Sequence, residues 1–220
     1  MTSNDLDYFR LCATCSLPQS PFLEVGSAKV ETLINLCDVA QELGVTSTLG
    51  VDLVQAEGVD HTFDFSIPRE DFNRKWPHLA YGTVALFNTL EHTFDPLLVL
   101  QNALSCVRPG GTLIVVVPSL WPIHKYPKDY CRLLPDWYCE FATRFDLELM
   151  AESFCWISAF GLFPIHSKNE FPNFQNSAKA IYPFRYWRSR LVHKVLNTYG
   201  RSHWGTHVSI GAAFRTRPAS

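Results

Sequence analysis

The fold is decided by Val84-Ala85-Leu86-Phe87-Asn88-Thr89-Leu90-Glu91-His92, and by Cys106-Val107-Arg108-Pro109-Gly110-Gly111 running into residues 112–118. Each stretch joins a short apolar strand to a polar or glycine-bearing turn, and residues 96–105 between them have helical apolar spacing. The unit predicts a strand, a helix and a strand, the crossover of a parallel sheet. Ligands of such sheets bind beyond the carboxyl ends of the strands, so functional side chains are expected at 88–92 and 118–130.

The segments on either side of this unit continue the alternation. Strands are predicted at 22–25, 47–51, 61–65, 147–150 and 206–214. Helices are predicted at 6–16, 29–43, 70–76 and 135–142. Alternation at this short spacing is typical of a three-layer α/β fold, in which helices cover both faces of one sheet.

Composition indicates a single domain over residues 1–220. The chain has 220 residues, 47% of them hydrophobic and 18% charged, enough for one well-buried core. Residues 1–20 are expected to form an N-terminal helical segment, and 160–203 an insertion that covers the active-site side. No basic patch precedes an apolar run near the start, and no apolar run approaches the roughly 20 residues of a membrane span. A soluble, cytoplasmic protein is expected.

Neither cysteine nor histidine spacing predicts a metal or disulfide site. The seven cysteines are scattered through segments with core periodicity, so reduced thiols are expected. Cys12 and Cys15 have redox or zinc spacing, but no second pair accompanies them, which favours two ordinary cysteines on a helix. His203 and His207 are four residues apart, yet Gly205 between them argues against a helix that could present both as ligands.

Charge is distributed unevenly along the chain. Up to residue 170 there are 21 acidic and 11 basic residues, whereas 171–220 has eight basic residues and no acidic one. The segment Arg185–Lys194 could dock an acidic protein partner or a second copy of the chain, or its arginines could pair with the acidic body. The pI of 6.4 argues against nucleic acid, because a basic footprint has a value above about 9.

Together with Phe22-Leu23-Glu24-Val25-Gly26 and Gly50-Val51-Asp52-Leu53, these segments resemble a class I S-adenosylmethionine-dependent methyltransferase with a type 11-like domain. The resemblance covers about residues 20–155. It implies a Rossmann-like sandwich whose seven-stranded sheet is mostly parallel with an antiparallel last strand. It also implies S-adenosylmethionine as the cofactor and methyl transfer as the reaction.

The resemblance assigns the nucleoside end of the cofactor to four positions. At Gly26, after the first strand, an absent side chain lets a ligand approach the backbone. Asp52 ends the second strand, where a carboxylate can accept both ribose hydroxyls. Asp64 and Phe65 match the family's adenine pair. The alternatives are a plain turn at Gly26, a solvated loop residue at Asp52 and a cap at Asp64.

At the methionine end, Glu24 would act through water on the ammonium group, and Asn88 to Leu90 would contribute backbone carbonyls. The complete expected set of cofactor-binding residues is Glu24, Gly26, Ser27, Asp52, Asp64, Phe65, Asn88 and Leu90. The first loop departs from the family, since Ala28 and Val30 stand where the second and third glycines would be. The same loop matches the dinucleotide-binding pattern Gly-x-Gly-x-x-Gly even less well, which argues against a nicotinamide-dependent dehydrogenase.

The acceptor is expected at Trp121-Pro122-Ile123-His124-Lys125-Tyr126-Pro127-Lys128-Asp129-Tyr130-Cys131-Arg132-Leu133-Leu134-Pro135, since similar methyltransferases carry His, then Asp-Tyr-x-Arg, then Pro here. His124 is the first candidate base because an unperturbed imidazole titrates near neutrality, and Asp129 could orient it. His92 is the second. Alternatively, these polar residues lock the loop through hydrogen bonds. The expected substrate-binding residues are Trp121, Tyr126, Tyr130 and Arg132.

The sequence therefore predicts methyl transfer to oxygen or nitrogen of a small or medium-sized acceptor, such as a sugar, an aromatic metabolite or a carrier-bound intermediate. Aromatic residues of the expected insertion would supply an apolar or ring-stacking pocket. Two alternatives remain. One is an inactive methyltransferase-like binding subunit, and the other is an enzyme that binds the cofactor but performs a non-methylating reaction.

Overall fold

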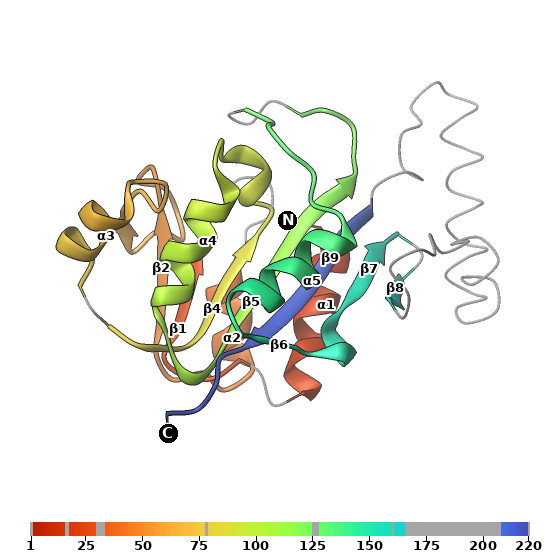
Figure 1. The fold of residues 1–220 in the computed structure, drawn as a ribbon, viewed down its shortest axis with the longest axis horizontal. Helices are drawn as coiled ribbons and strands as arrows, with labels where there is room; N and C mark the ends of the chain where they lie inside the picture. Colours follow the sequence, from red (N-terminus) through yellow and green to blue (C-terminus); the bar gives the residue numbers. More distant parts are fainter. Residues whose placement is uncertain are drawn as a thin grey trace.

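The structure is a computed structural model that describes residues 2–15, 18–29, 34–77, 79–124, 128–159, 161–165 and 208–219. The strands are β1 (Phe22–Val25), β2 (Thr48–Asp52), β3 (His61–Thr62), β4 (Tyr81–Phe87), β5 (Val107–Leu120), β6 (Glu148–Leu149), β7 (Cys155–Ser158), β8 (Gly161–Pro164) and β9 (Val208–Arg215). The helices are α1 (Ser3–Thr14), α2 (Leu36–Glu42), α3 (Arg69–Lys75), α4 (Pro96–Ser105) and α5 (Pro135–Arg144), with the short 3-10 turns η1 (Leu90–His92) and η2 (Ala151–Ser153) (Figure 1).

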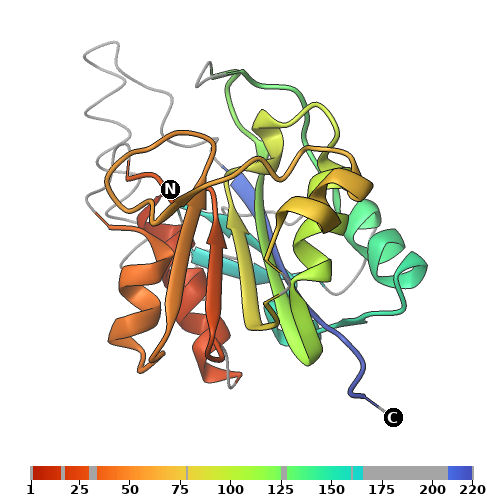
Figure 2. The ribbon, with the colours of Figure 1, turned by 90° about the vertical axis from the view of Figure 1, so that its left-hand side faces the viewer.

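All nine strands belong to one sheet of order β3-β2-β1-β4-β5-β9-β7-β8, with β6 also pairing with β9. The first five strands in this order are mutually parallel, so β1, β2 and β4 end at the same edge (Figure 2). β9 is antiparallel to both of its main neighbours, β5 and β7. The predicted α/β fold, with a mostly parallel sheet and an antiparallel last strand, is confirmed.

Within the described residues the sheet has nine strands where seven were expected, and the far side of β9 accounts for the difference. β6 pairs with β9 at Arg215 and Phe214, and β7 pairs with it from Gly211 to Val208, with η2 between them. The two strands therefore share one position in the sheet. β8 adds a new edge beside β7. β8 lies within the predicted insertion 160–203, of which only residues 161–165 are described.

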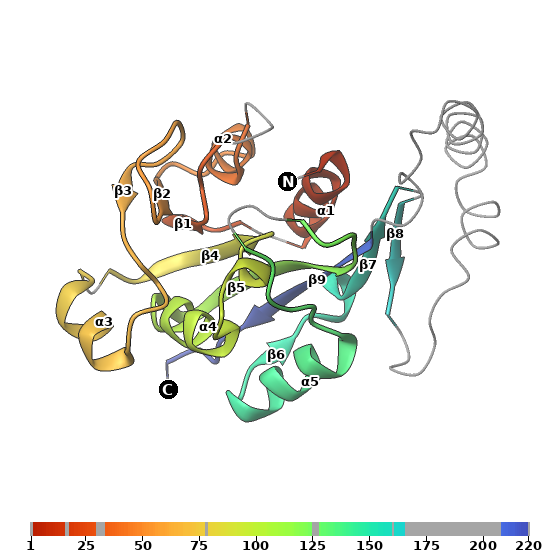
Figure 3. The ribbon, with the colours of Figure 1, turned by 90° about the horizontal axis from the view of Figure 1, so that it is seen from above.

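Helices cover both faces of the sheet, as predicted. α1 and α2 lie on one face, and α3, α4 and α5 lie on the other (Figure 3). Alternate residues of β4 divide between the two cores: Val84 and Leu86 pack with the α3–α5 side, and Ala85 and Phe87 with the α1–α2 side. Because both faces are covered, the strand reads as a continuous apolar run. Among the described helices, none has the length and apolarity to cross a membrane.

α2 is much shorter than the predicted helix 29–43. It starts at Leu36 because Asn35 and Asp38 form a capping box: the Asn35 side chain accepts the Asp38 N–H at 3.0 Å, and the Asp38 carboxylate accepts the Asn35 N–H at 3.2 Å. The Lys29 N–H is bonded to the carbonyl of Glu57 at 2.9 Å instead of entering a helix. The residues directly after Ser27 therefore belong to the loop at the strand ends.

β3 is also shorter than predicted, ending at Thr62 instead of residue 65. The rings of Phe63 and Phe65 leave the strand to pack with α3, with centroids 4.9 and 5.0 Å from that of Trp76. The three rings and Phe72 make edge contacts of the kind aromatic clusters favour. The Phe63 N–H still donates to the carbonyl of Asp52 at 2.9 Å, and beyond it the chain leaves β2 as the rings become buried.

The seven cysteines are free thiols, in agreement with the expectation of reduced thiols. Cys12 lies on α1 and Cys15 caps its end, which fits the interpretation as ordinary helix residues. Cys155 is buried within β7. Burial raises the pKa of Cys12 to about 12, so this thiol is un-ionised near neutral pH.

Glu24 joins β1 to α2 from inside the core. Its side chain is 3% exposed, and its Oε2 accepts the Cys37 N–H at 2.9 Å. Burial raises the pKa of this carboxyl to about 7, against the hydrogen bonds from the first turn of α2. The charge state of Glu24 is therefore linked to the stability of the fold.

Gly211 allows α1 to pack on β9. A Cβ at this position would lie 2.5 Å from Cζ of Tyr8, whose ring is fully buried. Gly211→Ala should therefore lower the free energy of unfolding by about 1–3 kcal/mol, the usual effect of overpacking a core, as measured by urea denaturation. In a Tyr8→Leu background the same substitution should cost much less. An equal cost in both backgrounds would contradict this packing.

Glu24→Gln should make stability less dependent on pH. The folded-state pKa of Glu24, about 7, exceeds the usual 4.5. The contribution of Glu24 to the free energy of unfolding is therefore fully present below pH 4.5 and is lost as the pH rises through 7. The shift corresponds to about 3 kcal/mol. Urea unfolding from pH 5 to 8 should show a flatter profile for Glu24→Gln than for wild type. Glu42→Gln, on the exposed end of α2, is the control; parallel profiles for all three proteins would refute the assignment.

Candidate functional site

The structure brings Gly26, Asp52 and Asn88 to one edge of the sheet, as the sequence predicts. Gly26 directly follows β1, and its N–H donates to the carbonyl of Val51 in β2 at 2.8 Å. The Asn88 N–H donates to the carbonyl of Val116 in β5 at 2.9 Å. The turns after β1 and β4 are thus each tied to a neighbouring strand at the carboxyl edge, where open parallel sheets bind ligands.

Asp52 retains acceptor capacity at this edge. Its Oδ2 accepts the Ala28 N–H at 3.2 Å and its Oδ1 accepts the Leu53 N–H at 2.7 Å. A carboxylate has about four acceptor positions, so about two remain. Leu53 and Val54, which follow it, are 63% and 61% exposed. Acceptor oxygens beside exposed apolar side chains suit a ribose joined to a flat ring; the sequence analysis left these two residues unassigned.

Thr89 fills the space that the missing side chain of Gly26 leaves. A Cβ on Gly26 would lie 2.2 Å from Oγ1 of Thr89, and the φ of Gly26 is +89°. The Thr89 hydroxyl lies 3.2 Å from the carbonyl oxygens of both Val25 and Phe87, within donating distance. This corrects the expectation that the side-chain direction of Gly26 is open to a ligand. The sequence analysis included Thr89 only in the range 88–90 that contributes backbone carbonyls, and it gave the Thr89 side chain no role.

Four other predicted cofactor residues are buried. Ser27 is 0% exposed, and its N–H donates to the Val51 carbonyl at 3.1 Å. Glu24 is bonded to α2, and the Phe65 ring is 3% exposed within the aromatic cluster. The Leu90 carbonyl already accepts the Thr93 N–H at 3.1 Å. The structure therefore does not bring the side chains of these residues to the open edge.

Asp64 is half-buried, and its Oδ1 accepts both the N–H and the hydroxyl of Ser66, at 2.7 and 2.6 Å. This is the local capping arrangement that the sequence analysis kept as an alternative. Its second oxygen is left for other partners. The expected adenine pair is thus divided, with Phe65 in the core and Asp64 in the loop after β3.

Asp5 of α1 reaches the same edge, a contact that the sequence analysis missed. The Asn88 side chain, on a residue with φ of +52°, donates to Oδ2 of Asp5 at 3.0 Å. Oδ1 of Asp5 is buried without a hydrogen-bond partner among the described residues. Burial raises the pKa of this carboxyl. The sequence signal, Thr2 and Asp5 at capping-box spacing, indicates a helix start and not a site.

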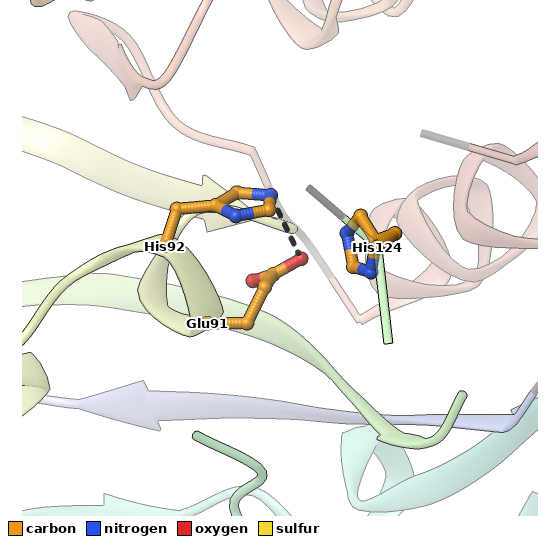
Figure 4. A group of neighbouring side chains, drawn as sticks. All are labelled: Glu91, His92 and His124. Atoms are coloured by element: carbon orange, nitrogen blue, oxygen red, sulfur yellow. Dashed lines mark ion pairs between the residues drawn. The ribbon is translucent and has the colours of Figure 1, made fainter. Parts of the chain in front are cut away.

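Glu91 and His92 of η1 meet His124 from the loop after β5 (Figure 4). One ligand-type atom from each of the three lies within 4.8 Å of the others. Nε2 of His92 is 3.7 Å from Oε1 of Glu91, and the two imidazole rings are nearly perpendicular with centroids 5.0 Å apart. The structure therefore joins the two histidines predicted as bases and adds Glu91, which the sequence analysis left without a role.

Burial controls the charge of this trio. Glu91 is fully buried, and neither carboxylate oxygen has a hydrogen-bond partner in the described part of the chain. Burial raises the pKa of Glu91 to about 8. Burial also lowers the pKa of His92, against the hydrogen bond between its Nδ1 and the carbonyl of Lys128 at 2.5 Å. A proton on Nδ1 leaves the lone pair on Nε2 facing Glu91.

Asp129 holds His124, as the sequence predicts. Its Oδ2 accepts the His124 N–H at 3.0 Å and lies 3.3 Å from Nδ1 of the same residue. Arg132 donates to both carboxylate oxygens, and this pairing lowers the pKa of Asp129 to about 2. The loop-locking role that the sequence analysis kept as an alternative is thus present, and it fixes the candidate base as well.

Two of the predicted substrate-binding residues, Trp121 and Tyr130, lie beside this trio. The Tyr130 N–H donates to the carbonyl of Glu91 at 2.7 Å, and the Trp121 ring lies 6.4 Å from that of His124. Phe94, which was not predicted, is 86% exposed, and its ring contacts that of Tyr130. Ile123, which lies in the predicted acceptor stretch but was given no role, is 84% exposed. Tyr126, Arg185–Lys194, His203 and His207 lie outside the described residues.

A hollow of about 450 Å³ lies elsewhere, beside the amino-terminal end of β4. Its lining consists of Arg69, Phe72, Asn73, Trp76, Leu79, Ala80 and Ser105. No predicted site residue contributes to it, and ligands of parallel sheets bind at the opposite ends of the strands. We therefore place the candidate site at the carboxyl edge.

Comparison with solved structures shows what the fold is similar to. The cyclase SpnF shares 14% identity at a TM-score of 0.56, covering 98% of this chain and 82% of its own. YcgJ from Bacillus subtilis shares 10% identity at 0.55, covering 97% and 100%. Phosphoethanolamine N-methyltransferase 2 of Haemonchus contortus, solved with phosphomonomethylethanolamine and S-adenosylhomocysteine, shares 11% at 0.53, covering 97% and 53%. No curated protein matches in sequence.

A family model described as a methyltransferase domain matches residues 7–162, which is more than half of the chain. The match includes the carboxyl ends of β1, β2, β4 and β5 and the loop that carries His124 and Asp129. S-adenosylmethionine is the cofactor of this family, as the sequence resemblance implied. The chain therefore belongs to the class I S-adenosylmethionine-dependent methyltransferase domain family.

Proposed function

We propose that this protein transfers the methyl group of S-adenosylmethionine to an oxygen or nitrogen of a small or medium-sized acceptor. The observation that carries the proposal is that Asp52, at the end of β2, and the trio Glu91, His92 and His124, in the loops after β4 and β5, lie at the same carboxyl edge of the parallel strands. The Thr89 side chain, next to Gly26 and two residues before Glu91, joins the two parts. One edge thus offers acceptors for a nucleoside and groups that can take a proton.

The residues at the nucleoside end fit the cofactor. Asp52 has about two acceptor positions left for the ribose hydroxyls, and Leu53 and Val54 offer exposed apolar surface for adenine. At the methionine end, Glu24 is bonded to α2, so the backbone of the turns after β1 and β4 would hold the amino-acid part of the cofactor. Bound here, the cofactor supplies an electrophilic methyl group on a positively charged sulfur.

On the acceptor side, the chain contributes positioning and a base. Methyl transfer is a single in-line displacement, so much of the catalysis comes from holding the nucleophile. His124, oriented by Asp129, would take the proton of an acceptor O–H or N–H. The exposed rings of Phe94 and Tyr130 favour an acceptor with apolar or aromatic parts, such as an aromatic metabolite, over a bare sugar.

Asp52→Ala should weaken S-adenosylmethionine binding at least tenfold in calorimetry, because a hydrogen bond to a charged group contributes about 1.5–3 kcal/mol. Asp52→Asn keeps one acceptor oxygen for one of the two loop N–H groups and removes the negative charge, so it disturbs the loop less than alanine does. The matched control is Asp71→Ala on the exposed face of α3. Unchanged affinity in both Asp52 variants would show that the ribose binds elsewhere.

Methyl transfer is tested with methyl-labelled S-adenosylmethionine and a panel of hydroxyl and amine acceptors. The wild type should label an acceptor, and His124→Ala should lower kcat by about 10²–10⁴-fold with unchanged cofactor affinity, as expected for loss of a general base. His61→Ala on β3 is the control.

Two results would overturn the proposal. Product formed without label would show the non-methylating alternative, a reaction class that the fold also hosts in the cyclase SpnF. Absence of cofactor binding at millimolar concentration would show an inactive binding subunit, which the replacement of two loop glycines by Ala28 and Val30 would then explain.

A further inference from the structure

We propose that Glu91, His92 and His124 form a binding site for one divalent transition-metal cation of the zinc type. The inference goes beyond methyl transfer and does not depend on it, because it rests on the three side chains alone. The sequence spacing predicted no metal site. Only the folded chain brings η1 and the loop after β5 together.

The donor set has the chemistry of a catalytic zinc site. Two imidazoles and one carboxylate, with one ligand atom each within 4.8 Å, match the three protein ligands that such sites use, with a further position left for water or substrate. Nitrogen ligands favour zinc, cobalt or iron over magnesium and calcium, which prefer oxygen. Glu91 and His92 are neighbours in the chain, so only His124 must be brought in by folding.

The distances require only a modest contraction. Ligand atoms at about 2.1 Å from a tetrahedral zinc ion lie about 3.4 Å from one another. Nε2 of His92 is already 3.7 Å from Oε1 of Glu91. The outer limit of 4.8 Å for the trio corresponds to a movement of about 1.4 Å, within the reach of a side-chain adjustment of His124, which is one-third exposed.

The Glu91 carboxylate lacks the partners that a buried acid normally has. It is 0% exposed, and within the described ranges neither oxygen has a hydrogen-bond partner. A buried polar group without such partners is costly unless something supplies them. The imidazole beside it is no hydrogen-bond partner, since Nε2 of His92 lies 3.7 Å from Oε1 of Glu91. A cation would satisfy Glu91 and leave both imidazoles neutral, as ligation requires.

His92 has the outer partner that metal-binding histidines use, and a carboxylate lies beside the ring of His124, whose Nδ1 has no hydrogen-bond partner among the described residues. The Lys128 carbonyl accepts from Nδ1 of His92 at 2.5 Å, so Nε2 is the free nitrogen. Oδ2 of Asp129 lies 3.3 Å from Nδ1 of His124, and Arg132 fixes that carboxylate. A carbonyl or carboxylate on the far nitrogen is the usual device that orients a metal-bound imidazole.

The charges around the trio favour a cation. Asp129 and Asp5 both act on Glu91 as negative charges, and Arg132 is the opposing positive charge. The guanidinium of Arg132 donates to both oxygens of Asp129, and it makes no hydrogen bond to the Glu91 carboxylate. A bound cation would lower the pKa of a hydroxyl group that occupies its open coordination position. The two imidazoles would then serve as ligands, and the cation would replace His124 as the group that activates an acceptor.

Cobalt(II) binding tests the site without cofactor or acceptor. Metal-free full-length protein, prepared with a chelator, is titrated with Co²⁺ while the visible d–d absorption is recorded. Zn²⁺ is then added to displace the cobalt. One equivalent of Co²⁺ should bind, and Glu91→Gln, His92→Ala and His124→Ala should each weaken binding at least tenfold. Asp129→Asn, which changes the carboxylate beside His124 together with its pairing to Arg132, should weaken binding by about 10- to 100-fold.

Matched histidine controls locate the signal. His61→Ala and the double variant His203→Ala with His207→Ala should bind Co²⁺ as the wild type does. Urea unfolding of Glu91→Gln confirms that this nearly isosteric variant is folded. Binding that all three site variants retain, a thiolate-to-cobalt charge-transfer band, or no stoichiometric binding would overturn the proposal. If the wild type binds cobalt but transfers no methyl label to any acceptor, that result would instead count against the proposed methyl transfer.

Discussion

The contact between Thr89 and Gly26 is the constraint on which the arrangement of the site depends. The Thr89 side chain occupies the space that only glycine leaves free at the end of β1, and its hydroxyl lies 3.2 Å from the Val25 carbonyl. This pins the turn after β4 to the turn after β1. The same turn continues into Glu91 and His92, so the nucleoside side and the proton-handling side of the edge are held at a fixed separation.

Much of the fold could be predicted because its signals are local. Apolar runs that end in polar or glycine turns predicted the succession of strands along the chain, and α4 begins and ends where the spacing predicts, at Pro96 and Ser105. The errors lie where tertiary packing overrides local pattern. The Asn35 capping box delays α2, the ring of Phe65 leaves β3 for the core, and η2 divides one sheet position into β6 and β7.

The sequence predicted which positions belong to the site better than it predicted which side chains contact one another there. Parallel strands end at the same edge of a sheet, and this rule predicted that Asp52, Asn88, His92 and His124 lie at one edge. It could not reveal that Asp5 of α1 contacts Asn88, or that Glu91 is buried without hydrogen-bond partners among the described residues. Those facts depend on which side chains folding brings together. Glu24 shows the reverse: the family pattern marks it for the cofactor, whereas the fold uses it to hold α2.

The most direct test of the account is a crystal structure of the protein with S-adenosylhomocysteine, the product form of the cofactor. The account predicts ribose hydroxyls within hydrogen-bond distance, about 2.5–3.0 Å, of the Asp52 carboxylate, with the adenine against Leu53. The sulfur should face the turn that carries Thr89 and Glu91. Nucleoside density in the hollow lined by Arg69 and Trp76, or any pose that leaves Asp52 without contact, would contradict the account.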